Sequence, residues 1–166
     1  MEYQEFSRLV DVISKLRDPK DGCPWDLKQT HKSLLKYLIE ESYEYVHATK
    51  KGDPKKMEEE LGDVLLQVLL HSQIASENGQ FNIESVSKTL ADKMVRRHPH
   101  VFEDRTLAND ADEVSKNWEA IKESEKNESE KKDKTKKTFR EEDAYLPSLM
   151  AAEKIGKKSK TVNFDW

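Results

Sequence analysis

Residues 59–70 read EELGDVLLQVLL, and their apolar side chains recur at the three- and four-residue steps of an α-helix. The apolar positions cover most of the helix surface: Leu61, Val64 and Val68 on one stripe, and Leu65, Leu66, Leu69 and Leu70 over much of the rest. A helix that is apolar nearly all round must be covered on every side. Neighbouring helices in a chain this small shield about two of its sides, so a second copy of the chain is the simplest further cover. We therefore expect packed helices and a homodimer or higher homo-oligomer.

Turn residues set the limits of this helix and of the two helices before it. Asp53 is a good N-cap, Pro54 a good first residue and Gly79 a good stop, which predicts a helix from Pro54 to about residue 78. Two earlier helices are expected over 3–16 and about 30–50, separated by turn residues. The positions expected on or near the buried sides are Leu34, Leu35, Leu38 and Val46 in the second helix, and Met57, Leu61, Val64, Leu65, Val68 and Leu69 in the third.

Helical patterns are weaker in the second half of the chain. Asn82 can cap a fourth helix, which carries Ile83, Val86, Leu90 and Met94 and which Pro99 ends by about His98. A shorter fifth helix is expected over 112–122 around Trp118, and a weak helical pattern returns over 147–160.

The segment from residue 121 to residue 143 is rich in charges of both signs and almost free of apolar residues. It cannot bury enough surface to offset the entropy lost on ordering, which favours a flexible linker or a frayed helix. We expect three parts: a domain over 1–122, a charged flexible linker over 123–145, and a C-terminal helix and tail over 146–166.

Composition narrows the class of protein. The chain has 166 residues and a net charge of -4, which offers no overall attraction for nucleic acid or an anionic membrane. Its single cysteine, Cys23, excludes an internal disulfide framework and a cysteine-based zinc cluster. No apolar run approaches the ~20 residues of a membrane span, and the first residues lack the pattern of a signal peptide. We expect a cytoplasmic protein that binds neither nucleic acid nor a membrane.

Two pairs of carboxylates, Glu41/Glu44 and Glu60/Asp63, lie in the second and third predicted helices. A spacing of three places both members of a pair on one helix face, about 60° apart around the axis and roughly 4.5 Å apart along it. If the two helices pack side by side, the four acids converge and repel one another unless a cation neutralises them. An oxygen-only cluster suits a hard divalent ion, Mg²⁺ or Mn²⁺.

Two other interpretations of these acids remain open. Glutamate is a common helix former, so the pairs could be ordinary solvated faces, although both pairs border apolar stripes. Glu44 and His47 form the Glu-x-x-His half of a ferritin-like di-iron site. The third helix lacks the matching half, because Asp63 stands where histidine is needed and His71 comes eight residues later.

Basic residues and a tryptophan recur at helical spacing nearer the C-terminus. Lys93, Arg96 and Arg97 share the fourth predicted helix, and Lys122 follows Trp118 by four residues. Lysine and arginine suit phosphate, and tryptophan suits stacking on a base. No phosphate-binding glycine loop is present, so the pattern favours a metal-bound polyphosphate ligand over a P-loop nucleotide site.

Five motifs together resemble the MazG family of nucleoside triphosphate pyrophosphohydrolases, in order and in spacing. They are GCPWD (22–26), QTH (29–31), YLIEESYE (37–44), EELGDVLLQV (59–68) and RRHPHVF (96–102). The resemblance extends from Met1 to about Lys122 and returns at residues 146–150. It implies an all-α fold of the NTP pyrophosphatase type, completed by dimerisation.

The resemblance also implies an activity and a set of site residues. The activity is Mg²⁺-dependent hydrolysis of nucleoside triphosphates to nucleoside monophosphate and pyrophosphate, a role in clearing the nucleotide pool. Glu41, Glu44, Glu60 and Asp63 would hold the metal, and Glu40 or one of these four acids, Glu41 among them, would be the general base. By the same likeness Lys93, Arg97, Trp118 and Lys122 match positions that contact nucleotide.

A weaker activity is the alternative. Many relatives carry two such domains in tandem, and residues 154–166 resemble the junction that leads into the second. In some two-domain relatives the second copy is the more active one. The competing expectation is therefore a catalytically weak module that binds nucleotide or serves dimerisation.

Overall fold

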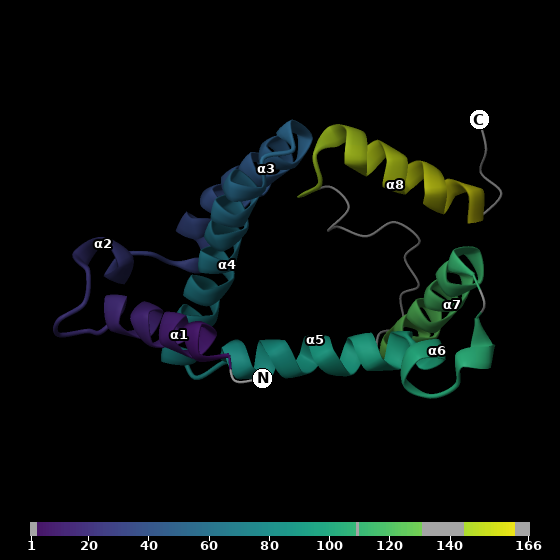
Figure 1. Ribbon diagram of the computed structural model, residues 1–166, viewed down its shortest axis with the longest axis horizontal. Helices are drawn as coiled ribbons and strands as arrows, with labels where there is room; N and C mark the ends of the chain where they lie inside the picture. The colour runs from purple at the N-terminus through teal and green to yellow at the C-terminus, as the bar shows by residue number, and fades with distance from the viewer. Residues whose placement is uncertain (1–2, 109, 131–144, 162–166) are drawn as a thin grey trace. The chain divides into compact units, whose positions relative to one another are not determined.

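The computed structural model describes residues 3–108, 110–130 and 145–161, and these ranges contain helices and no strand (Figure 1). The all-α prediction is confirmed. The elements in chain order are α1 (Gln4–Leu16), α2 (Pro24–Leu27), α3 (His31–Lys51), α4 (Pro54–Glu77), α5 (Ile83–Arg97), α6 (Pro99–Phe102), the 3₁₀ turn η1 (Arg105–Leu107), α7 (Ala111–Glu130) and α8 (Ser148–Thr161). They belong to two compact units, Met1–Met94 and Val95–Trp166.

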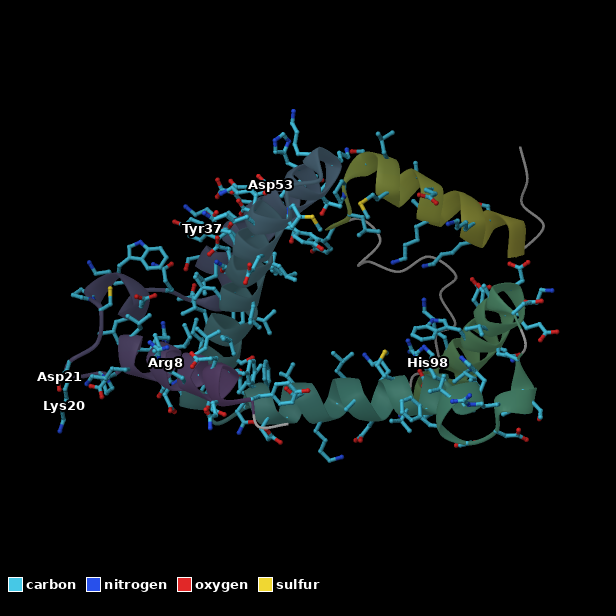
Figure 2. The ribbon with its side chains drawn as sticks, viewed as in Figure 1. Arg8, Lys20, Asp21, Tyr37, Asp53 and His98 are labelled. Carbon is cyan, nitrogen blue, oxygen red and sulfur yellow. The ribbon has the colours of Figure 1, made fainter. Side chains whose placement is uncertain are left out.

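Helices α3 and α4 form an antiparallel hairpin, and local sequence signals set its ends (Figure 1). Thr30 and Ser33 exchange hydrogen bonds between side chain and backbone N–H, which closes a capping box at the start of α3. Gly52 ends α3 with a φ of 68°, a left-handed conformation that favours glycine. Asp53, labelled in Figure 2 at this turn, accepts hydrogen bonds from the backbone N–H groups of Lys55 and Lys56. The predicted cap of α4 is confirmed.

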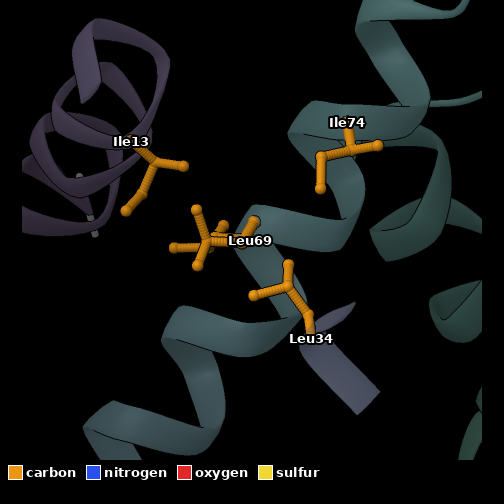
Figure 3. Close-up of a cluster of buried hydrophobic side chains, with 5 residues drawn as sticks. Ile13, Leu34, Leu69 and Ile74 are labelled. Carbon is orange, nitrogen blue, oxygen red and sulfur yellow. The ribbon is translucent and has the colours of Figure 1, made fainter. Parts of the chain in front are cut away.

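The core of the first unit lies where α1, α3 and α4 meet. Figure 3 shows Ile13 of α1, Leu34 of α3, and Leu69 and Ile74 of α4 directed toward one another. Each is at most 5% exposed, and burial of such a side chain stabilises a fold by about 1.5–3 kcal/mol. Next to this core, the guanidinium of Arg17 forms an ion pair with Glu77 at 2.6 Å and donates a hydrogen bond to the backbone carbonyl of Asp26. These contacts connect α1 to α2 and to the end of α4.

Several apolar side chains that the periodicity placed on buried faces are exposed in the single chain. Leu35, Val46, Leu61 and Val68 are between 37% and 52% exposed, so their expected burial is wrong for the isolated chain. The cause is geometric: α3 and α4 cover one face of each other, and α1 covers part of α4, whereas the apolar stripes extend further round both helices. The second copy expected to cover them stays a prediction.

In the second unit, α7 runs to Glu130, eight residues beyond the expected end near Lys122. The physical reason is that glutamate and lysine favour helix without apolar packing, and Glu125 anchors this part of α7 to Arg96 and Arg97. The predicted linker over 123–145 thus starts inside a helix, and residues 131–144 lie outside the described ranges. Helix α8 agrees with the pattern over 147–160. The three-part domain division stays a prediction.

None of the described helices has the length and apolar character needed to cross a membrane.

Candidate metal centre

Three of the four predicted metal ligands converge between α3 and α4. Glu41 of α3 and Glu60 and Asp63 of α4 each place a carboxylate oxygen so that these oxygens lie within 4.8 Å of one another. The antiparallel hairpin brings the two helix segments to the same level, and the spacing of three puts Glu60 and Asp63 on one face of α4. The arrangement fits the expectation that side-by-side packing would bring the acids together.

Glu44 lies at the edge of this group. It is exposed one turn beyond Glu41 and does not share the 4.8 Å cluster of oxygens. The nearby charge of Glu60 raises the pKa of Glu44, and burial and a side-chain hydrogen bond with Glu60 act in the same direction. Glu44 is therefore electrostatically coupled to the cluster, and its role as a fourth ligand stays a prediction.

Glu60 is the most deeply buried member of the cluster. It is 2% exposed, and its Oε1 accepts a 2.8 Å ion pair from Nζ of Lys56. Its Oε2 is buried and makes no hydrogen bond within the described chain. A buried carboxylate oxygen without a partner is costly unless an ion or a water meets it. The donor set therefore fits a hard divalent cation.

The pKa of Glu41 also reflects the crowding of negative charges in the cluster. Burial raises the pKa of Glu41, and the negative charges of Asp63, Glu44, Glu40 and Glu60 raise it further. These acids therefore disfavour one another's ionised forms when no cation is bound, and a divalent ion would reverse that effect.

An open pocket of about 460 Å³ adjoins the acids. It is lined by Glu40, Tyr43, Glu44, His47, Lys56 and Glu60. The predicted general base Glu40 thus lies in the pocket beside the acidic cluster, although it contributes no oxygen to the cluster itself.

The second histidine that the di-iron alternative requires does not join the acidic cluster in the structure. His47 lines the pocket, but His71 on α4 pairs with His31 and takes no part in the acidic cluster. The two Nδ1 atoms of His31 and His71 are 2.8 Å apart and the rings are stacked. Sequence reasoning missed this pair, because nothing in the spacing of residues 31 and 71 relates them before the hairpin is known.

The sequence reasoning also missed Lys56, which lines the pocket and pairs with Glu60. A signal for it was present, since a lysine four residues before Glu60 shares a helix face with it.

The predicted nucleotide-contacting residues are only partly brought together. The guanidinium of Arg97 lies 5.3 Å from the ring centre of Trp118, a cation–π contact. Lys93 lies one turn before Arg97 on α5, and Lys122 lies exposed one turn after Trp118 on α7. The ring of His98, labelled in Figure 2, meets Trp118 edge-on at 4.9 Å.

Glu125 joins this second cluster from α7. Its carboxylate accepts hydrogen bonds from Arg96 at 2.5 Å and from Arg97 at 2.6 Å. These bonds lower the pKa of Glu125 to about 2. Arg97 is thus held by an acid as well as by an aromatic ring, a combination that the spacing of the bases did not predict.

Comparison with known proteins gives a consistent result. The family model for the MazG nucleotide pyrophosphohydrolase domain matches residues 29–102. The chain is 46% identical to the nucleoside triphosphate pyrophosphohydrolase/pyrophosphatase MazG of Thermotoga maritima, over 97% of the chain and 59% of that protein. It is 51% identical to the uncharacterized protein YabN of Bacillus subtilis, over 93% of the chain and 30% of that protein. The chain therefore spans between about a third and three fifths of these curated relatives.

A solved structure is also similar. The crystal structure of a mazG-related protein from Thermotoga maritima superposes with a TM-score of 0.59 at 31% identity. The match covers 70% of this chain and 98% of that one.

Proposed function

Since this chain belongs to the MazG family of nucleotide pyrophosphohydrolase domains, we propose that it hydrolyses nucleoside triphosphates to nucleoside monophosphate and pyrophosphate with Mg²⁺. The observation that carries the proposal is the convergence of carboxylate oxygens of Glu41, Glu60 and Asp63, with Oε2 of Glu60 buried and without a hydrogen-bond partner in the described part of the chain. Relatives of 39–46% identity bear the name nucleoside triphosphate pyrophosphohydrolase, which supports the same activity.

In the proposed site Glu41, Glu44, Glu60 and Asp63 hold the cation, with Mg²⁺ the first choice and Mn²⁺ an acceptable substitute. A bound divalent ion neutralises charge on the phosphates and lowers the pKa of a water ligand. The acids would hold the cation, and its positive charge would let the phosphates of the triphosphate approach a group of carboxylates.

The reaction is an in-line displacement at the α-phosphorus. A water oxygen forms the new bond to phosphorus, the bond to the bridging oxygen breaks, and pyrophosphate leaves. A carboxylate oxygen of Glu40 or Glu41 accepts the proton of the water. Glu40 suits this role because it lines the pocket beside the cluster, and Glu41 is the alternative because its carboxylate lies within the cluster.

The nucleotide itself needs further contacts. We assign these to Lys93, Arg97, Trp118 and Lys122, with the arginine and lysines on phosphate and the indole on the base. The contact between Arg97 and Trp118 supports the assignment, since it orients a phosphate donor beside a stacking surface.

We also propose that the active form is a homodimer or higher homo-oligomer. Exposed apolar side chains support it: Leu35 and Ile39 lie one turn apart on α3, and Leu61 and Val68 lie two turns apart on α4. Continuous stripes of this kind on two adjacent helices are expected to be covered.

The second candidate is a weakly active module that binds nucleotide or serves dimerisation. It stays the alternative because the curated relatives that are named for the activity are longer than the part that this chain matches.

Product analysis separates the two candidates. The chain is incubated with a mixture of nucleoside triphosphates and Mg²⁺, with an excess of chelator as control, and the products are resolved by chromatography. The proposal predicts monophosphate and pyrophosphate in equal amounts, and none when the chelator is present. Nucleotide binding without turnover would favour the second candidate, and diphosphate with inorganic phosphate would contradict the proposed bond cleavage.

A further inference from the structure

Lys56 lies in the first turns of α4 with its ammonium group shared between two glutamates. Its Nζ is 2.8 Å from Oε1 of Glu60 and 3.0 Å from Oε1 of Glu59. The two acids differ sharply in environment, because the side chain of Glu60 is 2% exposed and that of Glu59 is 60% exposed. One lysine thus bridges a buried acid of the metal centre and an acid in solvent.

The contact between Lys56 and the buried acid, Glu60, compensates the charge of a carboxylate. The ammonium group of Lys56 is the cation that compensates the carboxylate of Glu60, whose other oxygen makes no hydrogen bond in the described part of the chain. An ionised carboxylate that is almost fully buried is strongly unfavourable without a cation. The ion pair with Lys56 therefore places a positive charge beside Glu60 in an arrangement that contains no metal ion.

The exposed acid, Glu59, gives the ammonium group of Lys56 an alternative partner. Lysine carries a compact charge on a flexible stem, and the side chain of Lys56 is 48% exposed at the open pocket. A rotation within the stem keeps the ammonium group on Glu59 while it leaves Glu60. The ammonium group and a divalent ion repel each other, so both cannot share the same oxygen of Glu60.

We propose that Lys56 is an internal counter-ion that exchanges with the divalent cation. Its ammonium group occupies Glu60 when the site is empty of metal, and it remains with Glu59 when a cation takes Glu60. The exchange preserves the geometry of the acidic cluster between catalytic cycles and lowers the affinity for the cation. This inference rests on the proposed metal centre.

The direct test is cation binding to the full chain without nucleotide. Isothermal titration with Mn²⁺ and with Mg²⁺ is carried out on wild type, Lys56→Met, Lys56→Arg and Lys55→Met. Methionine keeps the length of the side chain and removes its charge, arginine keeps the charge, and Lys55 is the neighbouring exposed lysine on the same helix. The melting temperature of each metal-free protein is measured in parallel.

The exchange predicts that Lys56→Met binds both ions about tenfold more tightly, the order expected for removing one charge a few ångströms from a divalent ion. The same variant should melt at a lower temperature without metal and gain more on adding it. Lys56→Arg and Lys55→Met should stay within about twofold of wild type, since both leave a cation beside Glu60.

Other binding results would contradict either the exchange alone or the metal centre as well. If wild type binds the ions and Lys56→Met binds them equally or more weakly, the metal centre stands and the exchange is overturned. If no variant binds either ion, the metal centre is wrong and the exchange falls with it.

Discussion

Nδ1 of His31 lies 2.8 Å from Nδ1 of His71, so a single proton joins the first residue of α3 to the C-terminal part of α4. Nε2 of His71 is buried and has no hydrogen-bond partner in the described chain. A buried N–H without an acceptor is costly, so we infer that His71 carries its proton on Nδ1 and donates it to His31. Two protonated rings cannot keep this contact, because both Nδ1 atoms would then be donors.

The histidine pair predicts a pH dependence of stability. Burial lowers the pKa of His71 and the charge of His31 lowers it further, from an ordinary value of 6.5. Between this lowered pKa and pH 6.5, the ring of His71 therefore binds more protons in the unfolded chain than in the folded chain. The contribution of His71 to stability is complete above pH 6.5 and is lost as the pH falls toward the lowered pKa.

Urea unfolding at pH 7.5 and pH 5.5 measures this effect. The free energy of unfolding should fall between the two pH values in wild type and fall less in His71→Gln, which has no titrating ring. The matched control is His47→Gln, because His47 is exposed and should leave the wild-type difference unchanged. An equal loss of stability in wild type and His71→Gln would show that the pair does not carry the effect.

The acidic cluster predicts that one substitution has opposite effects with and without metal. Glu41→Gln removes a charge that burial and the neighbouring acids already disfavour, so the metal-free protein should melt at a higher temperature. The same variant loses a ligand, so adding Mg²⁺ or Mn²⁺ should stabilise it less than wild type. Differential scanning calorimetry with and without each ion gives both values. A lower melting temperature of metal-free Glu41→Gln would contradict the repulsion.

The exposed apolar stripes predict the oligomeric state. Static light scattering at micromolar concentration should give twice the mass of the chain or more. Leu35→Glu should lower that mass, because it places a charge on a side chain that is 51% exposed in the single chain and covered in the oligomer. Lys32→Glu, on an exposed position of the same helix, should leave it unchanged. A well-folded wild-type monomer would refute the expected second copy.

Local signals predicted the helices well, since caps and breakers act within a few residues. Asp53, Pro54 and Gly79 marked the ends of α4 correctly, and the spacing of Glu60 and Asp63 placed them on one face. The extension of α7 to Glu130 was missed because it depends on high helix propensity and on the distant bond between Glu125 and Arg97.

The candidate site could be predicted only where spacing along one helix defines it. The acids followed from that rule, whereas the pairing of His31 with His71 depends on how α3 and α4 align. The exposure of Leu61 could not be foreseen either, because periodicity shows that a face is apolar and does not show which neighbour covers it.

The most direct test of the metal centre is the initial rate of pyrophosphate release from nucleoside triphosphate as a function of Mg²⁺. It is measured for wild type, Asp63→Asn and Glu58→Gln, an exposed acid of α4 outside the cluster. We expect Asp63→Asn to retain its helical circular dichroism and to lose turnover by about a hundredfold or more, with Glu58→Gln unchanged. Wild-type turnover in Asp63→Asn, or wild-type turnover that does not require Mg²⁺, would contradict the metal centre.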